Sequence, residues 1–266
     1  MLFSEHVVVV RGGGDLGTGV AFRLNRAGFP VVVLEIAEPL AIRRAVAAAS
    51  AVAGGRVEIE GLEARRVETP QAARRVARSG VIAVLVSPEL PTALSKFGVV
   101  DARLAKRNID TRTDQAACVV GLGPGFTAGV DCHAVIETMR GHHLGRVIWQ
   151  GSAAPNTGEP GVVGGASTQR VIRAPADGTV RWAVAIGDLV TAGQSLGRSG
   201  ETEMTAPIDG VVRGLIAPGI TVAKGTKVAD IDPRADQAAC FEISDKALAV
   251  GGGAVEAILT GLSRVS

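Results

Sequence analysis

The chain has 266 residues, of which 47% are apolar, and its formal net charge is +2. This composition excludes a disordered chain, and the near balance of charge with only 3% aromatic residues argues against nucleic-acid binding. Three widely spaced cysteines, Cys118, Cys132 and Cys240, argue against a disulfide framework and favour a reducing compartment. The apolar run near the N-terminus is too short to span a bilayer, so we expect a cytoplasmic protein that does not enter a membrane.

The first residues follow a nucleotide-binding pattern. His6–Val10 is a β-branched run, typical of a strand buried on both faces. Gly12, Gly14 and Gly17 come next with the spacing G-x-G-x-x-G. A helical stretch and a second apolar run, which ends at Glu35, complete a βαβ unit. This context favours nucleotide binding over the alternative, a glycine turn that packs a helix on a sheet and binds nothing.

The chemistry of this turn explains the glycines. Gly12 permits a sharp strand-to-helix turn, Gly14 lets the backbone approach a phosphate, and Gly17 lets the helix pack closely. The N–H groups at the helix start hold an anion, and a carboxylate at Glu35 accepts ribose hydroxyls while repelling a 2′-phosphate. The residues predicted to bind a cofactor here are Gly12, Gly13, Gly14, Asp15, Gly17 and Glu35.

Strands and helices alternate through the first half of the chain. Apolar runs at 81–86, 99–102 and 117–123 predict buried strands, and residues 40–55 and 70–80 have helical spacing. Residues 132–151 predict a hairpin with its turn at His142 and His143. We therefore predict an α/β class fold, with a Rossmann-like, mostly parallel sheet domain over residues 1–150.

A loop of mixed charge follows the strand that ends near Asp101. In an open α/β sheet, loops at the carboxyl ends of strands bind ligands. Lys106 and Arg107 could clamp a phosphate, and Asp101 or Asp110 could take a proton or hold a metal. The alternative is a surface loop whose charges pair with one another. The residues predicted to bind a second ligand or to act in catalysis here are Asp101, Arg103, Lys106, Arg107, Asn108 and Asp110.

A second glycine-rich loop lies at residues 121–133. Gly123, Gly125 and Thr127 could bind a phosphate, and Cys132 and His133 are candidate catalytic residues. As a thiolate, Cys132 (or Cys118) could carry a transferred sulfur or selenium, although a buried, inert cysteine is the commoner case. Neighbouring residues of a strand point to opposite faces, and metal-binding spacings such as C-x-x-C are absent, so we predict no metal site.

Beyond a Gly/Pro-rich linker predicted at 151–169, the sequence repeats itself. Residues 174–197 align without gaps onto residues 206–229, so that Asp177 and Gly178 recur as Asp209 and Gly210. Two copies predict two interlocked halves of a small all-β domain over 170–233, followed by a C-terminal helical segment over 234–266. Three consecutive glycines at 251–253 predict a weakened helix, two short helices or a loop that reaches back to the first domain.

Several of these segments carry family resemblances. The repeated copies resemble the half-repeats of biotinyl/lipoyl-type barrel-sandwich hybrids, but the turn at 198–204 contains no attachment lysine, so a docking or lid module without a carried cofactor is implied. Residues 8–35, 101–111, 121–151 and the repeats together resemble YqeB-type accessory proteins of selenium-dependent molybdenum hydroxylase systems. This resemblance implies a cytoplasmic maturation factor, distantly similar to XdhC-type molybdenum cofactor chaperones.

We therefore expect a nucleotide (NAD, ATP or CTP) or a molybdopterin-type cofactor as ligand. The expected partners are a molybdenum hydroxylase or its cofactor-loading proteins, with a homo-oligomer left open. Whether the protein is an enzyme stays open. The rival hypotheses are a NAD-dependent oxidoreductase, with His133 or Lys106 as proton donor, and a non-catalytic docking scaffold.

Overall fold

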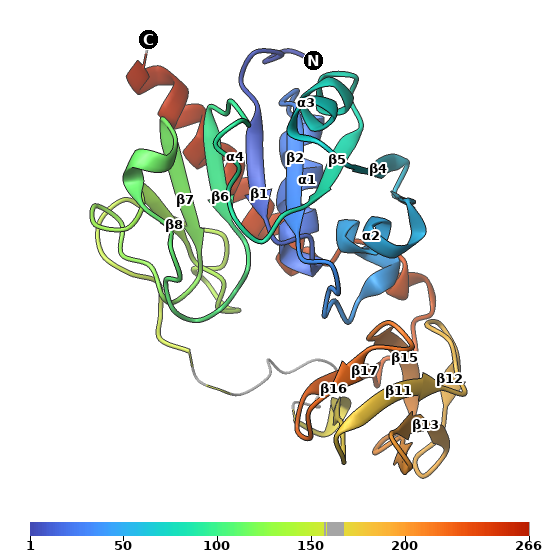
Figure 1. Cartoon of the computed structure of the whole chain (residues 1–266). Helices are drawn as coiled ribbons and strands as arrows, with labels where there is room; N and C mark the ends of the chain where they lie inside the picture. The colour runs from blue at the N-terminus through green and yellow to red at the C-terminus, as the bar shows by residue number, and fades with distance from the viewer. Residues whose placement is uncertain (157, 159–167, 266) are drawn as a thin grey trace. The chain divides into compact units, whose positions relative to one another are not determined.

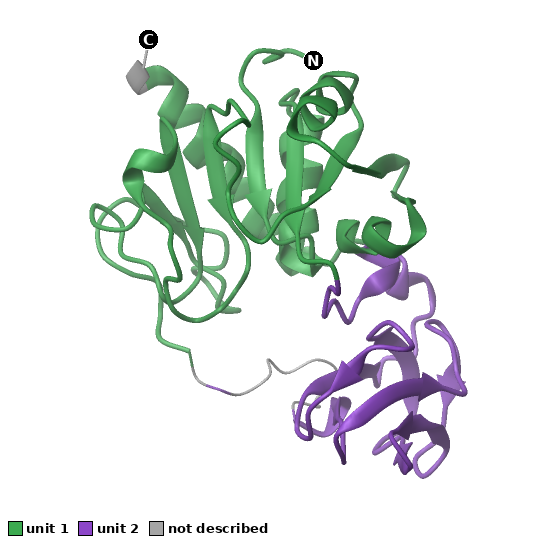
Figure 2. Ribbon diagram, viewed as in Figure 1, with its two compact units in different colours: residues 1–37, 47–156, 243–266 green, residues 38–46, 157–242 purple. Residues whose placement is uncertain are grey.

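The computed structural model describes residues 1–156, 158 and 168–265, and most of the predicted linker at 151–169 lies outside these residues. The chain forms two compact units. Unit 1 comprises residues 1–37, 47–156 and 243–266, and unit 2 comprises residues 38–46 and 157–242 (Figure 2). Within the described residues, no helix has the length and apolar character needed to cross a membrane.

Unit 1 is built on one nine-stranded sheet (Figure 1). Its strands are β1 (Val8–Arg11), β2 (Val31–Glu35), β3 (Arg56–Ile59), β4 (Leu62–Val67), β5 (Ile82–Val86), β6 (Gly98–Asp101), β7 (Cys118–Leu122), β8 (Ala134–Ile136) and β9 (Val147–Ile148). Their spatial order is β3-β4-β5-β2-β1-β6-β7-β8-β9. The end pairs β3/β4 and β8/β9 are antiparallel and all other pairs are parallel. The predicted α/β fold with a mostly parallel sheet is confirmed.

The strand order reverses at the centre of this sheet. From β1 the chain passes to β2, forms the edge with β3 and β4, and comes back to β5 between β4 and β2. It then crosses to the other side of β1 with β6 and continues through β7 and β8. Arg11 and Asp101, the last residues of β1 and β6, are neighbours in register. In open α/β sheets such a reversal opens a crevice at the carboxyl ends of the strands, which is where ligands bind. Both the glycine turn and the charged loop leave the sheet at this point.

In the described part of unit 1, four helices accompany the sheet. They are α1 (Asp15–Arg26), α2 (Ala51–Gly54), α3 (Pro70–Arg78) and α4 (Asp245–Val265). The helix predicted over 70–80 is confirmed as α3, with Thr69 as its cap. The helix predicted over 40–55 is wrong, since this stretch holds two short 3-10 turns and α2. The physical reason is that residues 38–46 belong to unit 2, where Arg44 Nε donates to the carbonyl of Leu215 at 2.6 Å.

The C-terminal helix α4 is continuous through its three glycines and packs alongside α1 (Figure 1). A Cβ atom on Gly251 would lie 2.5 Å from the carbonyl oxygen of Gly19, and one on Gly253 would lie 2.1 Å from that of Gly145. Gly19 in turn approaches Ala247, so the two helices run in the same direction. The glycines that weaken an isolated helix therefore permit close helix packing within unit 1.

Unit 2 contains two four-stranded antiparallel sheets, ordered β10-β17-β15-β12 and β14-β13-β11-β16. The strands are β10 (Val171–Arg173), β11 (Gly178–Trp182), β12 (Leu189–Val190), β13 (Ser195–Ser199), β14 (Thr202–Thr205), β15 (Gly210–Leu215), β16 (Thr221–Val222) and β17 (Lys227–Asp232). Each sequence copy supplies a strand to the other copy's sheet, because β11 pairs with β16 and β12 pairs with β15.

The hydrogen bonds of unit 2 repeat with the sequence. Asp177 Oδ1 accepts from the N–H of Lys224 at 2.6 Å, and the equivalent Asp209 Oδ1 accepts from the N–H of Ala192 at 2.7 Å. Each aspartate thus closes a turn of the opposite copy. The prediction of two interlocked halves is confirmed by these reciprocal contacts.

Candidate functional site

The glycine turn after β1 is sterically restricted to glycine at Gly12, Gly13 and Gly17. A Cβ atom on Gly13 would lie 2.9 Å from the N atom of Ala49. Gly12 has φ of +98°, and a Cβ atom there would lie 3.0 Å from the carbonyl oxygen of Ala102. A Cβ atom on Gly17 would lie 2.0 Å from the carbonyl oxygen of Gly12. The turn therefore needs these glycines in order to reverse tightly between strand and helix.

The peptide groups of Gly13 are held on both sides. Its N–H donates to Glu35 Oε2 at 2.8 Å. Its carbonyl accepts from Thr18 Oγ1 at 3.0 Å and from the N–H of Ala49 at 2.9 Å. Because Thr18 is buried and also accepts from the N–H of Ala48, the turn is fixed before any ligand arrives.

Gly14, in contrast, is open. It precedes α1 with φ of −69° and ψ of −170°, and a Cβ atom built on it has no neighbour within 4 Å. In the described part of the chain, the N–H groups of Gly14, Leu16 and Gly17 have no hydrogen-bond acceptor. Free N–H groups at the start of a helix, together with the helix dipole, favour an anion.

Glu35 lies at the end of β2, as predicted, but its carboxylate already has two backbone donors. Oε2 accepts from Gly13 and Oε1 accepts from the N–H of Ile36 at 2.9 Å. Each carboxylate oxygen has a second acceptor position, so ribose binding stays a prediction. In the structure, the hydrogen bond from Gly13 to Glu35 orients the peptide group of Gly13.

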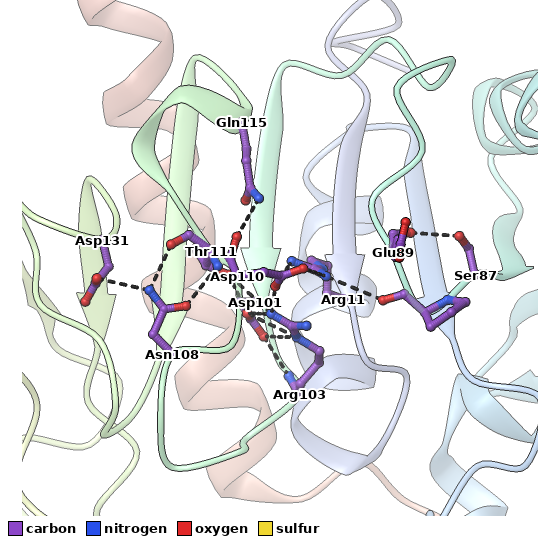
Figure 3. A network of polar contacts seen from close by, with 11 residues as sticks. Arg11, Ser87, Glu89, Asp101, Arg103, Asn108, Asp110, Thr111, Gln115 and Asp131 are labelled. Carbon is purple, nitrogen blue, oxygen red and sulfur yellow. Dashed lines mark hydrogen bonds and ion pairs between the residues drawn. The ribbon is translucent and has the colours of Figure 1, made fainter.

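The charged loop after β6 is tied to the sheet by a buried arginine (Figure 3). Arg11 donates to both oxygens of Asp110, at 2.7 and 2.9 Å. The Arg11 side chain is 2% exposed and that of Asp110 is 43% exposed. Hydrogen bonds, from Arg11 first and from Arg103 next, lower the pKa of Asp110 to about 2, although its partial burial opposes the shift. Asp110 is therefore ionised at neutral pH.

Asp101 is the second carboxylate of this cluster. It is 1% exposed and accepts from Arg103, with a shortest distance of 2.5 Å, and from Thr111 Oγ1 at 2.6 Å. Arg103 also donates to Asp110 at 2.6 Å. Two arginines, Arg11 and Arg103, thus pair with two aspartates, Asp101 and Asp110 (Figure 3). This arrangement matches the alternative expected from the sequence, a loop whose charges pair with one another. With these partners in place, nothing in the geometry supports metal binding or proton transfer by Asp101 or Asp110.

Asn108 extends the same network to the next loop. Its side chain donates to the carbonyl of Thr111 at 2.8 Å and to Asp131 at 3.0 Å, and it accepts from the N–H of Thr111 (Figure 3). Asn108 therefore shapes the loop and joins it to residues 127–131. Its predicted role as a ligand contact finds no support in these bonds.

Lys106 and Arg107 are left at the exposed tip of the loop. Both side chains are exposed and have no hydrogen bond or ion pair to any described residue. Lys106 has φ of +61° and Leu104 has φ of +56°, a backbone region that is unfavourable for such residues. Strain of this kind persists where the surrounding structure fixes it, as the Arg11–Asp110 pair does here.

The glycines of the second glycine-rich loop pack against other parts of the protein and do not line an open site. A Cβ atom on Gly123 would lie 2.4 Å from Thr138 Oγ1, and one on Gly125 would lie 2.6 Å from the N atom of Arg107. Thr127 shares a hydrogen bond with Ser152 at 3.0 Å. The close approach predicted for these glycines is present, but it serves loop packing. A phosphate role for Gly123, Gly125 and Thr127 has no geometric support.

Cys132 and His133 do not form a reactive pair. Cys132 is fully buried, and its burial raises the pKa of the thiol to about 12, so the thiol is protonated at neutral pH. His133 Nδ1 accepts from the N–H of Val119 at 2.9 Å. Val119 lies in the amino-terminal half of β7, whereas the glycine turn follows the carboxyl end of β1. The structure therefore favours the inert alternative for Cys132 and separates His133 from the turn.

Among the described residues, no group of three or more His, Cys, Asp or Glu side chains could hold a metal ion. His142 and His143 lie together in the turn between β8 and β9, with ring centroids 5.4 Å apart. The predicted hairpin is confirmed by the antiparallel pairing of these strands.

Three residues at this edge of the sheet escaped the sequence interpretation. Arg11 is a charge at the end of a valine run, and Thr18 is a buried hydroxyl one turn into α1. Lys246 is a lysine in the first turn of α4, where the helix dipole disfavours a cation. Each is a polar residue at a position where the local pattern disfavours it, and that is the signal that could have found them.

Comparison with known proteins gives one close sequence match. The chain is 50% identical over 258 residues to "Uncharacterized protein YqeB" from Escherichia coli K12, a match that covers 96% of this chain and 48% of that protein. A search of protein-family models found no match. The chain thus spans about half the length of the curated relative that it matches.

Solved structures give weak matches. They include a succinylglutamate desuccinylase/aspartoacylase from Rhodobacter sphaeroides, with a TM-score of 0.23 and 24% identity over 25% of this chain and 22% of that one. The ectoine utilization protein EutE from Ruegeria pomeroyi has a TM-score of 0.23 and 13% identity over 85% of this chain and 57% of its own. An aspartoacylase family protein from Mesorhizobium loti has a TM-score of 0.28 and 10% identity over 85% and 84%. The relationship that spans nearly the whole of this chain is the sequence similarity to YqeB.

Proposed function

We propose that this protein is a nucleotide-binding accessory factor that acts in the maturation of a molybdenum hydroxylase. The glycine turn would hold a phosphate of a nucleotide or of a molybdopterin-type cofactor. The observation that carries the binding proposal is the set of N–H groups of Gly14, Leu16 and Gly17, which have no acceptor among the described residues. They lie where the strand order reverses, at the edge where α/β sheets bind ligands.

The second part of the proposal concerns the role in the cell. The resemblance of residues 8–35, 101–111 and 121–151 to YqeB-type accessory proteins supports a cytoplasmic factor for a selenium-dependent hydroxylase. Unit 2, with its two interlocked antiparallel halves, would be a barrel-sandwich hybrid that docks a partner. Since its turn at 198–204 has no lysine, it would not carry biotin or lipoate.

Geometry removes His133, one of the two proton donors expected for the rival oxidoreductase, and leaves the exposed Lys106 as the other. A dehydrogenase needs a proton donor beside the nicotinamide, and His133 is bonded to the amino-terminal half of β7. Cys132, with a pKa of about 12, is a poor carrier for a transferred sulfur or selenium. The proposed role is therefore binding and delivery of a phosphorylated ligand, without a covalent step on this chain.

Thermal unfolding of the full chain with NAD, ATP, CTP or free molybdopterin tests the proposal. A ligand at one hundred times its dissociation constant should stabilise the fold by about 2.7 kcal/mol. Stabilisation by one of these ligands, with no turnover of small alcohols or aldehydes, supports a binding factor. Turnover with NAD would favour the oxidoreductase, and no stabilisation by any ligand would leave a docking scaffold.

A further inference from the structure

The hairpin of β3 and β4 leaves one edge of the nine-stranded sheet open. β3 is the last strand on this side, and among the described residues no further strand pairs with it. Its two exposed side chains, Arg56 and Glu58, carry opposite charges and lie two residues apart, so they stand on the same face of the sheet. Neither side chain makes a hydrogen bond or an ion pair with another described residue.

The backbone groups of Arg56 and Glu58 point away from β4. The N–H of Arg66 donates to the carbonyl of Gly55 at 2.8 Å, so these two residues form a hydrogen-bonded pair of the hairpin. Bonded and non-bonded pairs alternate along an antiparallel ladder. Gly55 and Val57 therefore bond to β4, whereas the N–H and C=O groups of Arg56 and Glu58 face the open edge.

Within the hairpin, each charge of β3 faces a like charge. Arg56 lies opposite Arg65, and Glu58 lies opposite Glu63. Arg65 and Glu63 already pair with each other along β4, at 2.8 and 3.0 Å. Like charges directly opposite each other destabilise a sheet. The contacts inside the hairpin therefore do not explain the charges of β3, which a strand on the open edge with opposite charges would neutralise.

We propose that β3 pairs antiparallel with β3 of a second copy of this chain, in a two-fold register centred on Val57. In this register Arg56 lies opposite Glu58 of the partner subunit, and Glu58 lies opposite the partner subunit's Arg56. Each of these pairs exchanges two backbone hydrogen bonds, which use the groups that face the open edge. On the other face the half-buried Val57 contacts Val57 of the partner subunit. Such a dimer is independent of ligand binding at the glycine turn.

Charge selects this register over its neighbours. Only groups that face the edge can bond across it, so the two-fold centre can move only by whole residues along β3. A centre at Arg56 would bring the two arginines together, and a centre at Glu58 would bring the two glutamates together. An edge strand with charges of one sign repels a second copy. β3 carries both signs, at a spacing that is complementary to itself.

Sedimentation equilibrium of the full chain tests the proposal. The wild type should show a reversible monomer–dimer equilibrium with a dissociation constant of about 10–100 μM, as expected of a small interface. Arg56→Glu and Glu58→Arg each place like charges opposite one another and should weaken self-association at least about tenfold. An equimolar mixture of these two variants should dimerise at least as well as the wild type, because every charge of one variant then faces an opposite charge of the other.

The control is Glu201→Arg, which makes the same change of charge at an exposed turn of unit 2. It should self-associate like the wild type, and thermal melting followed by circular dichroism checks that each variant folds. A wild type that stays monomeric up to about 1 mM would overturn the proposal. A dimer that both single charge reversals leave intact would place the interface on another surface and would also overturn it. Failure of the mixed variants to associate, where each alone is monomeric, would overturn the register centred on Val57.

Discussion

Arg11 and Asp110 form a two-pronged ion pair at the point where the strand order of the sheet reverses, with N–O distances of 2.7 and 2.9 Å (Figure 3). The pair joins the last residue of β1 to a loop that follows β6. It holds that loop, whose first residues Ala102 and Arg103 lie against Gly12 of the glycine turn. The pair therefore links the stability of unit 1 to the geometry of the candidate site.

Asp110→Ala should destabilise the protein by about 3 kcal/mol, because it leaves the buried Arg11 guanidinium without its two-pronged partner. Urea unfolding followed by circular dichroism measures this change. Asp114→Ala is the matched control, since it breaks an ion pair with Arg112 in which both side chains are 69% exposed. The control should change stability by at most about 0.5 kcal/mol. Equal effects of the two substitutions would show that the Arg11–Asp110 pair is not structural.

The same pair predicts a dependence of stability on pH. The pKa of Asp110 is lowered from 3.8 to about 2, so the folded state binds the proton less readily than the unfolded chain. The resulting stabilisation is fully present above pH 3.8 and is lost as the pH falls toward 2. Because the Asp110 side chain is 43% exposed, we expect this pH-dependent stabilisation to be about 1 kcal/mol after solvent screening. The difference in unfolding free energy between wild type and Asp110→Asn should therefore fall by about 1 kcal/mol between pH 5 and pH 2. A difference that stays constant over this range would contradict the assignment.

Two adjacent glycines of α4 should respond oppositely to alanine. Gly251→Ala places a Cβ atom 2.5 Å from the carbonyl oxygen of Gly19 and should destabilise the protein by about 2 kcal/mol. Gly252→Ala has open space around it and should stabilise the helix by about 1 kcal/mol. Thermal unfolding of both variants measures the difference. Stabilisation by both substitutions would mean that α4 does not pack on α1 as described.

The three cysteines should be unreactive in the folded protein. Cys118, Cys132 and Cys240 are all buried, and burial raises the pKa of Cys132 to about 12 and also raises that of Cys240. An aromatic disulfide reagent at neutral pH should modify none of them within minutes, and should modify all three in denaturant. Rapid modification of Cys132 in the native state would restore it as a candidate carrier of sulfur or selenium.

Local patterns were sufficient to predict much of unit 1. Valine-rich runs predicted the central strands, and the glycine spacing predicted the turn between β1 and α1. Patterns failed where a distant segment decides the structure. Residues 40–55 have helical spacing, but Arg44 is drawn to Leu215 in unit 2. The glycines of α4 are unfavourable for an isolated helix, but the backbone of Gly19 in α1 lies so close to Gly251 that only glycine fits there.

The candidate site was harder to predict, because residue type alone does not show whether a charge is paired. The charged loop looked like a set of ligand contacts, yet Asp101, Arg103 and Asp110 bind one another. Glu35 was assigned to a ribose, and the structure shows it holding the N–H of Gly13. Glu35→Ala would therefore disturb the turn itself, so it cannot separate ribose binding from phosphate binding.

Gly14→Asp tests most directly whether the N–H groups of the turn bind an anion. Gly14 has the extended backbone of a helix cap and open space around it, so an aspartate there should cap α1 and leave the fold intact or slightly more stable. Its carboxylate would occupy the same N–H groups and repel a phosphate. Gly252→Asp, the same change at another open glycine, is the control. Calorimetric titration with the ligand that most stabilises the wild type should show binding to the control and at least about a hundredfold weaker binding to Gly14→Asp; undiminished binding to a folded Gly14→Asp variant would contradict the proposed site.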